Sequence, residues 1–269
     1  MEFKVNSKVL EKLLARIIPA VPGRTPMPVL ENFLVEIRDG LMTVSATDME
    51  IALRSSLNVP SEEDIKMVIP AKLFFDIVRS LGDTQIKFET ESNSKLKILT
   101  DKGTYNISYS PSDDFPDIPE VSKEKEVAMN GQDLKKMIEQ TSFAMSKEDM
   151  RPAMTGTLME FTGEGLRFVT TDGHRLVKYI NKTITSSKDE QYIVPERAIA
   201  VLSKLLGDTD IKMFLSKTNI SFNFGDIELI TRLIGEKYPA YNSVIPLENE
   251  NILSVKTGDL LSTVKRMML

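Results

Sequence analysis

Carboxylates and a single histidine are the side chains whose types and spacing in this sequence could support chemistry. Asp48 and Glu50 lie two residues apart, and Asp172 stands two residues before His174. Paired carboxylates can hold two divalent ions for phosphate chemistry, so a metal-dependent nuclease that uses Asp48, Glu50 and Asp172 is one hypothesis. In the other interpretation Asp48 and Asp172 are turn residues, because each directly follows a predicted strand.

His174 is a weak candidate for a general base. It follows the Asp172-Gly173 turn, and the sequence offers no cysteine and no evident serine partner for a nucleophilic mechanism. A histidine on the surface or in a groove is the simpler interpretation. Zero cysteines exclude disulfides and thiolate metal sites, and one histidine is too few for an imidazole zinc site. The sequence therefore implies no cofactor.

Composition predicts a globular protein with room for two domains. The 269 residues are 41% hydrophobic and 27% charged. No run approaches the roughly 20 apolar residues of a membrane helix, and the N-terminus lacks a signal-peptide pattern, so we expect a cytoplasmic protein without a membrane partner. The net charge of −5 has the wrong sign for binding phosphates over the whole surface. If DNA is a partner, the positive charge must be segregated.

An internal repeat organises the chain. Residues 68–88 read VIPAKLFFDIVRSLGDTQIKF and residues 193–213 read IVPERAIAVLSKLLGDTDIKM, an offset of 125. Asp48 and Asp172 keep nearly the same offset, 124, and therefore occupy equivalent places in a duplicated domain. Duplicated positions favour the structural interpretation of both. A third copy begins at residues 253–261, which resemble residues 127–135.

Four amphipathic helices are predicted from apolar residues at helical spacing. Asn6 or Ser7 and Asn130 are good N-caps for the first and third helix, and a proline precedes each of the other two. Gly82 and Gly207 are predicted to end the second and fourth helices in the left-handed conformation. The helices are expected over residues 7–18, 71–81, 131–143 and 196–206.

Alternating segments between the helices predict hairpin-linked strands, with turns at residues 39–40, 103, 163–165 and 225–226. This pattern indicates an antiparallel α+β fold in which each domain sets two helices against sheet. A proline-rich stretch at 111–119 followed by charged residues breaks both periodicities. We therefore predict domains over residues 1–122 and 123–248, with a third begun at 249–269.

The predicted helices are basic and the remainder is acidic. The four helices together carry +4 and the whole chain carries −5, which leaves −9 for the strands and loops. For any one residue, Lys or Arg on a solvated helix face is an equally good explanation. The sum over four equivalent helices says more than any single member.

Several motifs in a fixed order resemble the bacterial DNA sliding clamp family, the β subunit of the DNA polymerase III holoenzyme. The most specific is TTDGHRL at residues 170–176; the others are PGRT at 22–25, PVLEN at 28–32, TDME at 47–50, IPAKLFFD at 69–76 and DFP at 114–116. The resemblance implies a non-catalytic processivity factor of DNA replication, built as a head-to-tail homodimeric ring of tandem clamp domains. Outer sheets and inner basic helices would surround duplex DNA.

In such a ring the inner helices face phosphates loosely, which suits sliding better than base readout does. The resemblance places these residues toward DNA: Arg24, Lys72, Lys135, Lys136 and Arg197.

Clamp-binding peptides of the replicative polymerase, the clamp loader and repair proteins dock in an apolar pocket of the family. The matching positions are Met154, Thr171, Gly173, His174, Arg175, Leu176, Pro239 and Val244. Two departures from the family pattern affect this surface. Pro152-Ala153 stands where aromatic residues are frequent, and Ser243 stands where an arginine is common.

Subunit association is expected along an edge strand of the first domain. The resemblance assigns Tyr105 and Ile107 to the dimer edge, and an exposed strand with Tyr105, Ile107 and Tyr109 is prone to association. Because the sequence stops soon after the third copy begins, we expect the rest of that domain to belong to a longer protein. A protein-interaction scaffold that never surrounds DNA is the remaining alternative.

Overall fold

The structure, a computed structural model, describes residues 2–61, 63–91, 93–123, 125–148 and 150–268. It divides into two units, Met1–Lys237 and Tyr238–Leu269. The first unit contains both full copies of the repeat, and the second contains the short helix η5 (Tyr241–Val244) and α5 (Thr257–Met267). The predicted domain limits, 1–122, 123–248 and 249–269, stay predictions, because the two copies form a single compact unit.

Both copies follow the same order of strands and helices. The first consists of β1 (Glu2–Asn6), α1 (Ser7–Ile17), β2 (Asn32–Arg38), β3 (Leu41–Thr47), β4 (Ile51–Asn58), β5 (Ile65–Pro70), α2 (Ala71–Ser80), β6 (Gln85–Glu91), β7 (Lys95–Thr100) and β8 (Gly103–Ser108). The second consists of β9 (Glu126–Asn130), α3 (Gly131–Thr141), β10 (Gly156–Thr162), β11 (Gly165–Thr171), β12 (Leu176–Asn181), β13 (Glu190–Pro195), α4 (Glu196–Leu205), β14 (Asp210–Leu215), β15 (Asn219–Phe224) and β16 (Ile227–Arg232). The four predicted helices and the four predicted hairpins are confirmed.

The described residues form three antiparallel sheets. Two have four strands, in the orders β1-β6-β7-β8 and β12-β11-β10-β13. The third has eight strands, in the order β5-β2-β3-β4-β16-β15-β14-β9, and it runs from the first copy into the second. The two copies meet where β4 pairs with β16, with Leu53 opposite Leu229. We call this pairing the domain junction.

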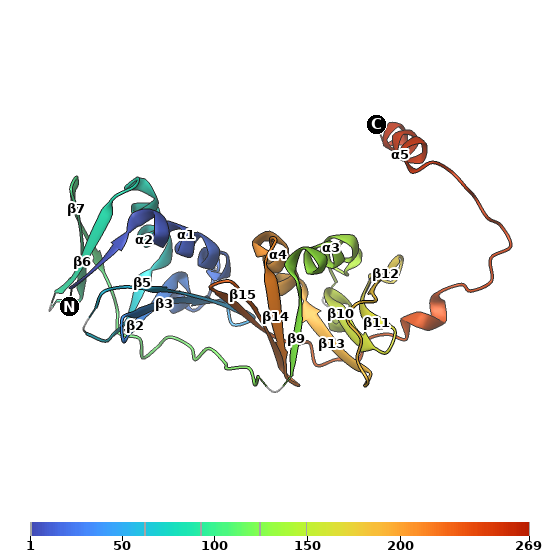
Figure 1. Cartoon of the computed structure of the whole chain (residues 1–269), viewed down its shortest axis with the longest axis horizontal. Coiled ribbons are helices and arrows are strands. Elements are labelled where there is room, and N and C mark those ends of the chain that lie inside the picture. Colours follow the sequence, from blue (N-terminus) through green and yellow to red (C-terminus); the bar gives the residue numbers. More distant parts are fainter. Residues whose placement is uncertain (1, 62, 92, 124, 149, 269) are drawn as a thin grey trace. The chain divides into compact units, whose positions relative to one another are not determined.

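The helices cover the sheets with their apolar faces. Leu10, Leu14 and Ile17 of α1 recur at helical spacing and are fully buried, as are Leu134 and Ile138 of α3. Helix α1 packs against α2, and α3 packs against α4. In Figure 1 these four helices lie on one side of the eight-stranded sheet. The buried faces explain why the apolar stripes predicted the helices so well.

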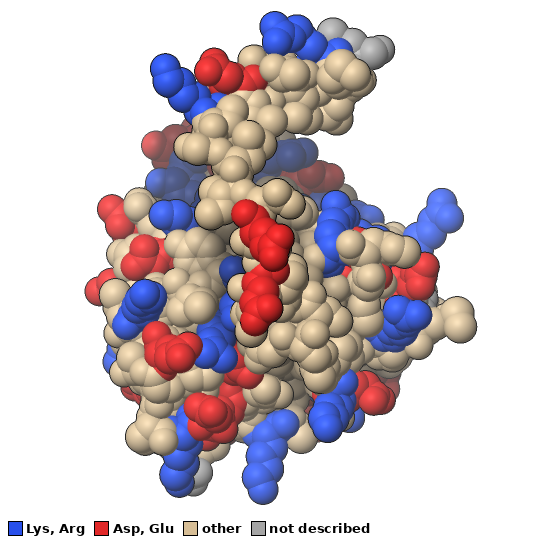
Figure 2. Space-filling model, turned by 90° about the vertical axis from the view of Figure 1, so that its right-hand side faces the viewer, with Lys and Arg blue, Asp and Glu red and all other residues tan. Residues whose placement is uncertain are grey.

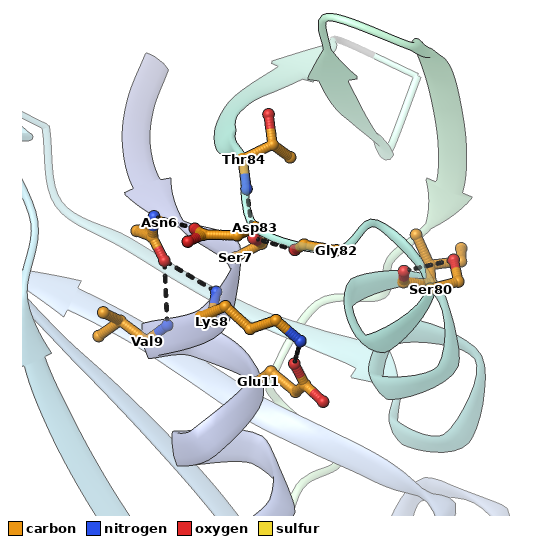
Figure 3. Close-up of polar contacts among 10 residues, drawn as sticks. Asn6, Ser7, Lys8, Val9, Glu11, Ser80, Gly82, Asp83 and Thr84 are labelled. Carbon is orange, nitrogen blue, oxygen red and sulfur yellow. Dashed lines mark hydrogen bonds and ion pairs between the residues drawn. The ribbon is translucent and has the colours of Figure 1, made fainter.

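The start of α1 is fixed by a network that reaches the end of α2 (Figure 3). Asn6 Oδ1 accepts hydrogen bonds from the backbone N–H groups of Lys8 and Val9, at 2.9 and 3.3 Å, which makes Asn6 the N-cap. The hydroxyl of Ser7 donates to the carbonyl of Gly82 at 2.6 Å and accepts from the N–H of Thr84 at 2.9 Å. The N-cap of α1 and the turn after α2 thus stabilise each other.

Two details of the sequence analysis were wrong. Gly82 has the predicted left-handed backbone, with φ of 72°, but Gly207 does not. Helix α4 ends one residue earlier, because Leu206 already has the extended conformation with ψ of 135°. Ile107, expected to be exposed on its edge strand, is only 2% exposed, because it is the residue of β8 that packs into the hydrophobic core.

Candidate functional site

The TTDGHRL motif forms a tight turn between β11 and β12. Thr171 Oγ1 accepts from the N–H of Gly173 at 3.1 Å and donates to the carbonyl of Arg175 at 2.8 Å. Asp172 Oδ1 accepts from the N–H groups of His174 and Arg175, both at 3.0 Å. One hydroxyl and one carboxylate oxygen therefore hold the whole turn, which we call the second turn (residues 171–175).

Hydrogen bonding keeps the carboxylate of this turn ionised. The backbone N–H of Arg175, then that of His174, lower the pKa of Asp172 from 3.8 to about 2. The second oxygen, Oδ2, accepts from Arg175 Nε at 2.9 Å. Gly173 has a φ of 90°, a region that residues with a Cβ rarely adopt. The aspartate thus holds this turn, and the glycine adopts its backbone without the strain that a Cβ would add.

Apolar and cationic groups surround the second turn. Met154 is buried, and a Cβ added at Gly173 would lie 3.7 Å from Met154 Cε and 3.2 Å from Arg151 Nη1. The guanidinium of Arg175 lies over the ring of Phe143, 5.7 Å from its centre. Phe143 is 57% exposed. The sequence analysis missed Phe143, although an aromatic residue outside the apolar stripe of its helix was a usable signal.

The other predicted pocket residues divide between the two units. Leu176 is half-buried at the start of β12. Pro239 and Val244 belong to the second unit, where Val244 is the last residue of η5. In that unit Ser243 donates its hydroxyl to the carbonyl of Ala240 at 2.7 Å. Thr171, Gly173, His174, Arg175 and Leu176 are contiguous in the first unit, and the pocket as a complete set stays a prediction.

The first copy of the repeat contains the same turn at residues 47–51, which we call the first turn. Thr47 Oγ1 accepts from the N–H of Met49 at 3.0 Å and donates to the carbonyl of Ile51 at 2.7 Å. Asp48 Oδ1 accepts from the N–H groups of Glu50 and Ile51 at 3.1 and 2.9 Å. Each of these four hydrogen bonds has its counterpart in the second turn. Asp48 and Asp172 are therefore turn residues, as one of the two interpretations predicted.

The first turn differs in the partner of its second carboxylate oxygen. Asp48 Oδ2 accepts from Arg197 Nε, in the second copy, at 2.9 Å. Arg197 also donates from Nη2 to the carbonyl of Pro19 at 2.6 Å. One of the predicted DNA-facing guanidinium groups is thus engaged in holding the two copies together.

The remaining predicted DNA-facing residues differ in how exposed their side chains are. Arg24, Lys72 and Lys136 are exposed, whereas Lys135 is half-buried and lies 3.4 Å from the carbonyl of Leu206. Part of the positive charge of α1 is also neutralised, because Arg16 pairs with Asp226 across the domain junction at 2.5 Å. Figure 2 shows basic and acidic side chains interspersed on the face that it presents, without a broad patch of one sign.

Two strands lie at sheet edges that correspond to the domain junction. At an offset of about 124, β12 is the counterpart of β4, and β8 is the counterpart of β16. Within the described ranges β8 pairs only with β7, and β12 only with β11. On β8, Tyr105 is 36% exposed and occupies the position equivalent to Leu229. The counterparts of β4 and β16, which pair at the domain junction, are thus two unpaired sheet edges, β12 and β8.

Neither a metal site nor a membrane span was found in the part of the chain that the structure describes. No group of three or more histidine, aspartate or glutamate residues there could hold a metal ion, so Asp48, Glu50 and Asp172 are not gathered into one. Burial, and next the charge of Asp48, raise the pKa of Glu50. No described helix is long and apolar enough to cross a membrane.

Comparison with known sequences identifies the family. The profile described as DNA polymerase III beta subunit, N-terminal domain, matches residues 1–119, and the profile of the central domain of that subunit matches residues 128–240. The beta sliding clamp of Escherichia coli strain K12 is 32% identical over 251 residues, which cover 91% of this chain and 68% of that protein. The chain belongs to the beta sliding clamp family.

Other relatives agree with this assignment. The beta sliding clamp of Chlamydia muridarum is 27% identical over 271 residues, which cover all of this chain and 74% of that protein. A sliding clamp from Bartonella birtlesii, solved bound to griselimycin, superposes with a TM-score of 0.90 at 30% identity, over 99% of this chain and 73% of that one. A clamp from Bacillus subtilis superposes with a TM-score of 0.94 at 24% identity, over the same shares, and supports the fold.

The family assignment confirms the resemblance and the α+β fold of tandem clamp domains predicted from the sequence. It also makes the chain a processivity clamp of DNA polymerase III, an accessory subunit of that enzyme.

Proposed function

We propose that this clamp encircles duplex DNA as a head-to-tail ring, slides on it, and tethers the replicative polymerase and other proteins through a peptide pocket at the second turn. It has no catalytic residues of its own in this proposal. The observation that carries the ring is the pairing of β4 with β16. Because β12 and β8 repeat these two strands, a further clamp domain can pair with each edge in the same way.

Sliding is supported by the charge of the helices. Exposed Lys72 on α2 and Lys136 on α3, together with Arg24, give a weak attraction for phosphates that does not depend on base sequence. Arg197 contributes mainly by holding the two copies together through Asp48. Loose and delocalised contacts of this kind allow the protein to move along the duplex.

Encirclement predicts that retention depends on the topology of the DNA. We expect the assembled clamp, loaded onto a nicked circular plasmid, to withstand a high-salt wash and to leave when the plasmid is linearised. Lys72→Glu is expected to weaken the attraction for DNA measured at low salt and to lower its salt slope by about one, because one phosphate contact is lost. Lys102→Glu, at an exposed turn, is the matched control. Equal retention on circular and linear DNA would contradict the ring.

The peptide pocket is tested separately. Leu176→Asp is expected to weaken binding of a clamp-binding polymerase peptide at least ~10-fold, because it places a carboxylate in an apolar site. The affinity can be measured by fluorescence anisotropy of a labelled peptide. Leu41→Asp is the matched control, since Leu41 also begins a strand but is exposed at the β2–β3 turn. An unchanged peptide affinity in Leu176→Asp would contradict the pocket assignment and would not bear on the proposed ring.

A further inference from the structure

Two adjoining cavities open beside the first turn. The larger has a volume of about 670 Å³ and lies between the first turn and residues of the second copy, including Pro195 and Ile234. The smaller, of about 430 Å³, extends toward the proline-rich segment and includes Asp117. Met49, Glu50 and Arg232 line both cavities. Together they form a groove along the domain junction, and their volumes are in the range of sites that bind small ligands or peptide side chains.

Met49 gives this groove an exposed apolar anchor. It has a φ of 74° at the position where the second turn has Gly173, and its side chain is 58% exposed. A residue with a Cβ is strained in this backbone region, and such strain concentrates where a side chain has to be presented. Leu233 and Pro152 add further apolar surface to the larger cavity. The second turn has no side chain at the equivalent position.

The charged groups of the groove favour a cation. Its lining holds four carboxylates and two guanidinium groups. Asp48 is paired with Arg197, and Glu196 is paired with Lys147. Among the described contacts no hydrogen bond or ion pair engages the carboxylate of Glu50. Arg197 acts on Glu50 only through its charge, and burial and the charge of Asp48 outweigh that effect. A partly desolvated carboxylate without an ion pair attracts Lys or Arg side chains and repels the phosphates of DNA.

We propose that the groove at the domain junction is a second docking site, which binds an extended segment of a partner protein through an apolar side chain on Met49 and a basic side chain on Glu50. The inference goes beyond the proposed peptide pocket and takes from it only the shared geometry of the two turns. The two sites differ in charge. Arg151 lies beside Gly173 at the second turn, where Arg175 is paired with Asp172, whereas the groove at the first turn holds Glu50 and Asp117 together with Arg232.

Methionine methyl groups provide a direct test. The probes are the acetylated and amidated peptide Leu-Lys-Leu-Lys-Leu and its counterpart with Glu in place of Lys, titrated into protein with ¹³C-labelled Met methyl groups. We expect the basic peptide to shift the Met49 resonance and leave that of Met154, beside the second turn, in place. The acidic peptide is expected to leave Met49 in place. The Met49 resonance can be assigned with Met49→Leu.

Charge variants make the test specific. Glu50→Gln should lower the affinity for the basic peptide at least ~5-fold, and Glu50→Lys should make the groove prefer the acidic peptide. Glu139→Gln, an exposed carboxylate on α3, should change nothing. The proposal is overturned if Met49 does not respond to the basic peptide at millimolar concentration, responds equally to both peptides, or responds only to a duplex oligonucleotide. Leu176→Asp should leave the Met49 response intact, so failure of the proposed peptide pocket is recognised separately.

Discussion

The first and second turns have the same backbone and different surroundings. In both, a threonine hydroxyl and one aspartate oxygen make the same set of hydrogen bonds. The second aspartate oxygen binds Arg197 of the other copy in the first turn and Arg175 of the same turn in the second. The hydrogen bonds that shape the loop are therefore the same in both copies. The copies differ in the partner of the second aspartate oxygen and in the residue that follows the aspartate.

The difference teaches how one motif can serve two purposes. At the domain junction the aspartate fastens two domains, and the side chain of Met49 is presented between them. At the second turn the arginine is held locally, and Gly173 leaves space beside Met154. Removing the threonine hydroxyl should therefore lower stability equally in both turns. Removing Arg197 at the first turn and Arg175 at the second should lower it by different amounts.

The largest expected effect comes from the shared threonines. Thr47→Val and Thr171→Val should each lower the free energy of unfolding by about 2 kcal/mol, because each removes two hydrogen bonds between the threonine hydroxyl and the backbone of its turn. Urea unfolding followed by circular dichroism measures the loss. Thr104→Val on exposed β8 is the control and should stay within about 0.5 kcal/mol. A large loss in only one turn would show that the two are not energetically equivalent.

The arginines should separate the turns. Arg197→Ala is expected to cost about 1 kcal/mol, since Arg197 holds both Asp48 and the carbonyl of Pro19 and is partly buried. Arg175→Ala should cost only a few tenths of a kcal/mol, because its ion pair with Asp172 is more exposed. The same unfolding experiment compares the two variants. Equal losses would contradict the view that only the first turn fastens two domains.

The smallest effect is a contrast in titration. Asp172 should titrate at about 2, below its ordinary value of 3.8, so its stabilising contribution is complete above 3.8 and is lost as the pH falls toward 2. The pKa of Glu50 is raised, so its ionisation disfavours the native state as the pH rises past its ordinary value of 4.5. Side-chain carboxyl ¹³C shifts measure both midpoints. A midpoint of Glu50 below 4.5 would contradict the partly buried environment of the groove.

Local patterns predicted most of the fold. The apolar stripes located α1–α4 to within about two residues, and Asn6 and Asn130 are the N-caps that the sequence indicated. These features depend on neighbours within one or two turns of helix, so the sequence contains the information directly. The prediction for Gly207 was wrong because the end of α4 also depends on contacts outside the helix. The carbonyl oxygen of Gly207 lies 2.8 Å from the position that a Cβ on Gly131 would take.

The candidate site was predicted only in its local part. The motif at residues 170–176 indicated the second turn, because threonine, aspartate and glycine form it from their own backbone bonds. That Arg197 faces DNA stays a prediction, and the sequence did not indicate that its guanidinium reaches Asp48, which is 149 residues away in the sequence. The groove beside Met49 had no signal of its own, since its walls come from both copies.

The sequence by itself determined the repeat, the helices, the hairpins and the two turns, because periodicity, capping and turn chemistry act over a few residues. Tertiary structure decided which strands join the copies and which partner each aspartate holds. Leu53 faces Leu229 and Asp48 meets Arg197 only when β4 pairs with β16. Pairing between strands so far apart in the chain depends on the fit of whole sheets, and no short stretch of sequence specifies it.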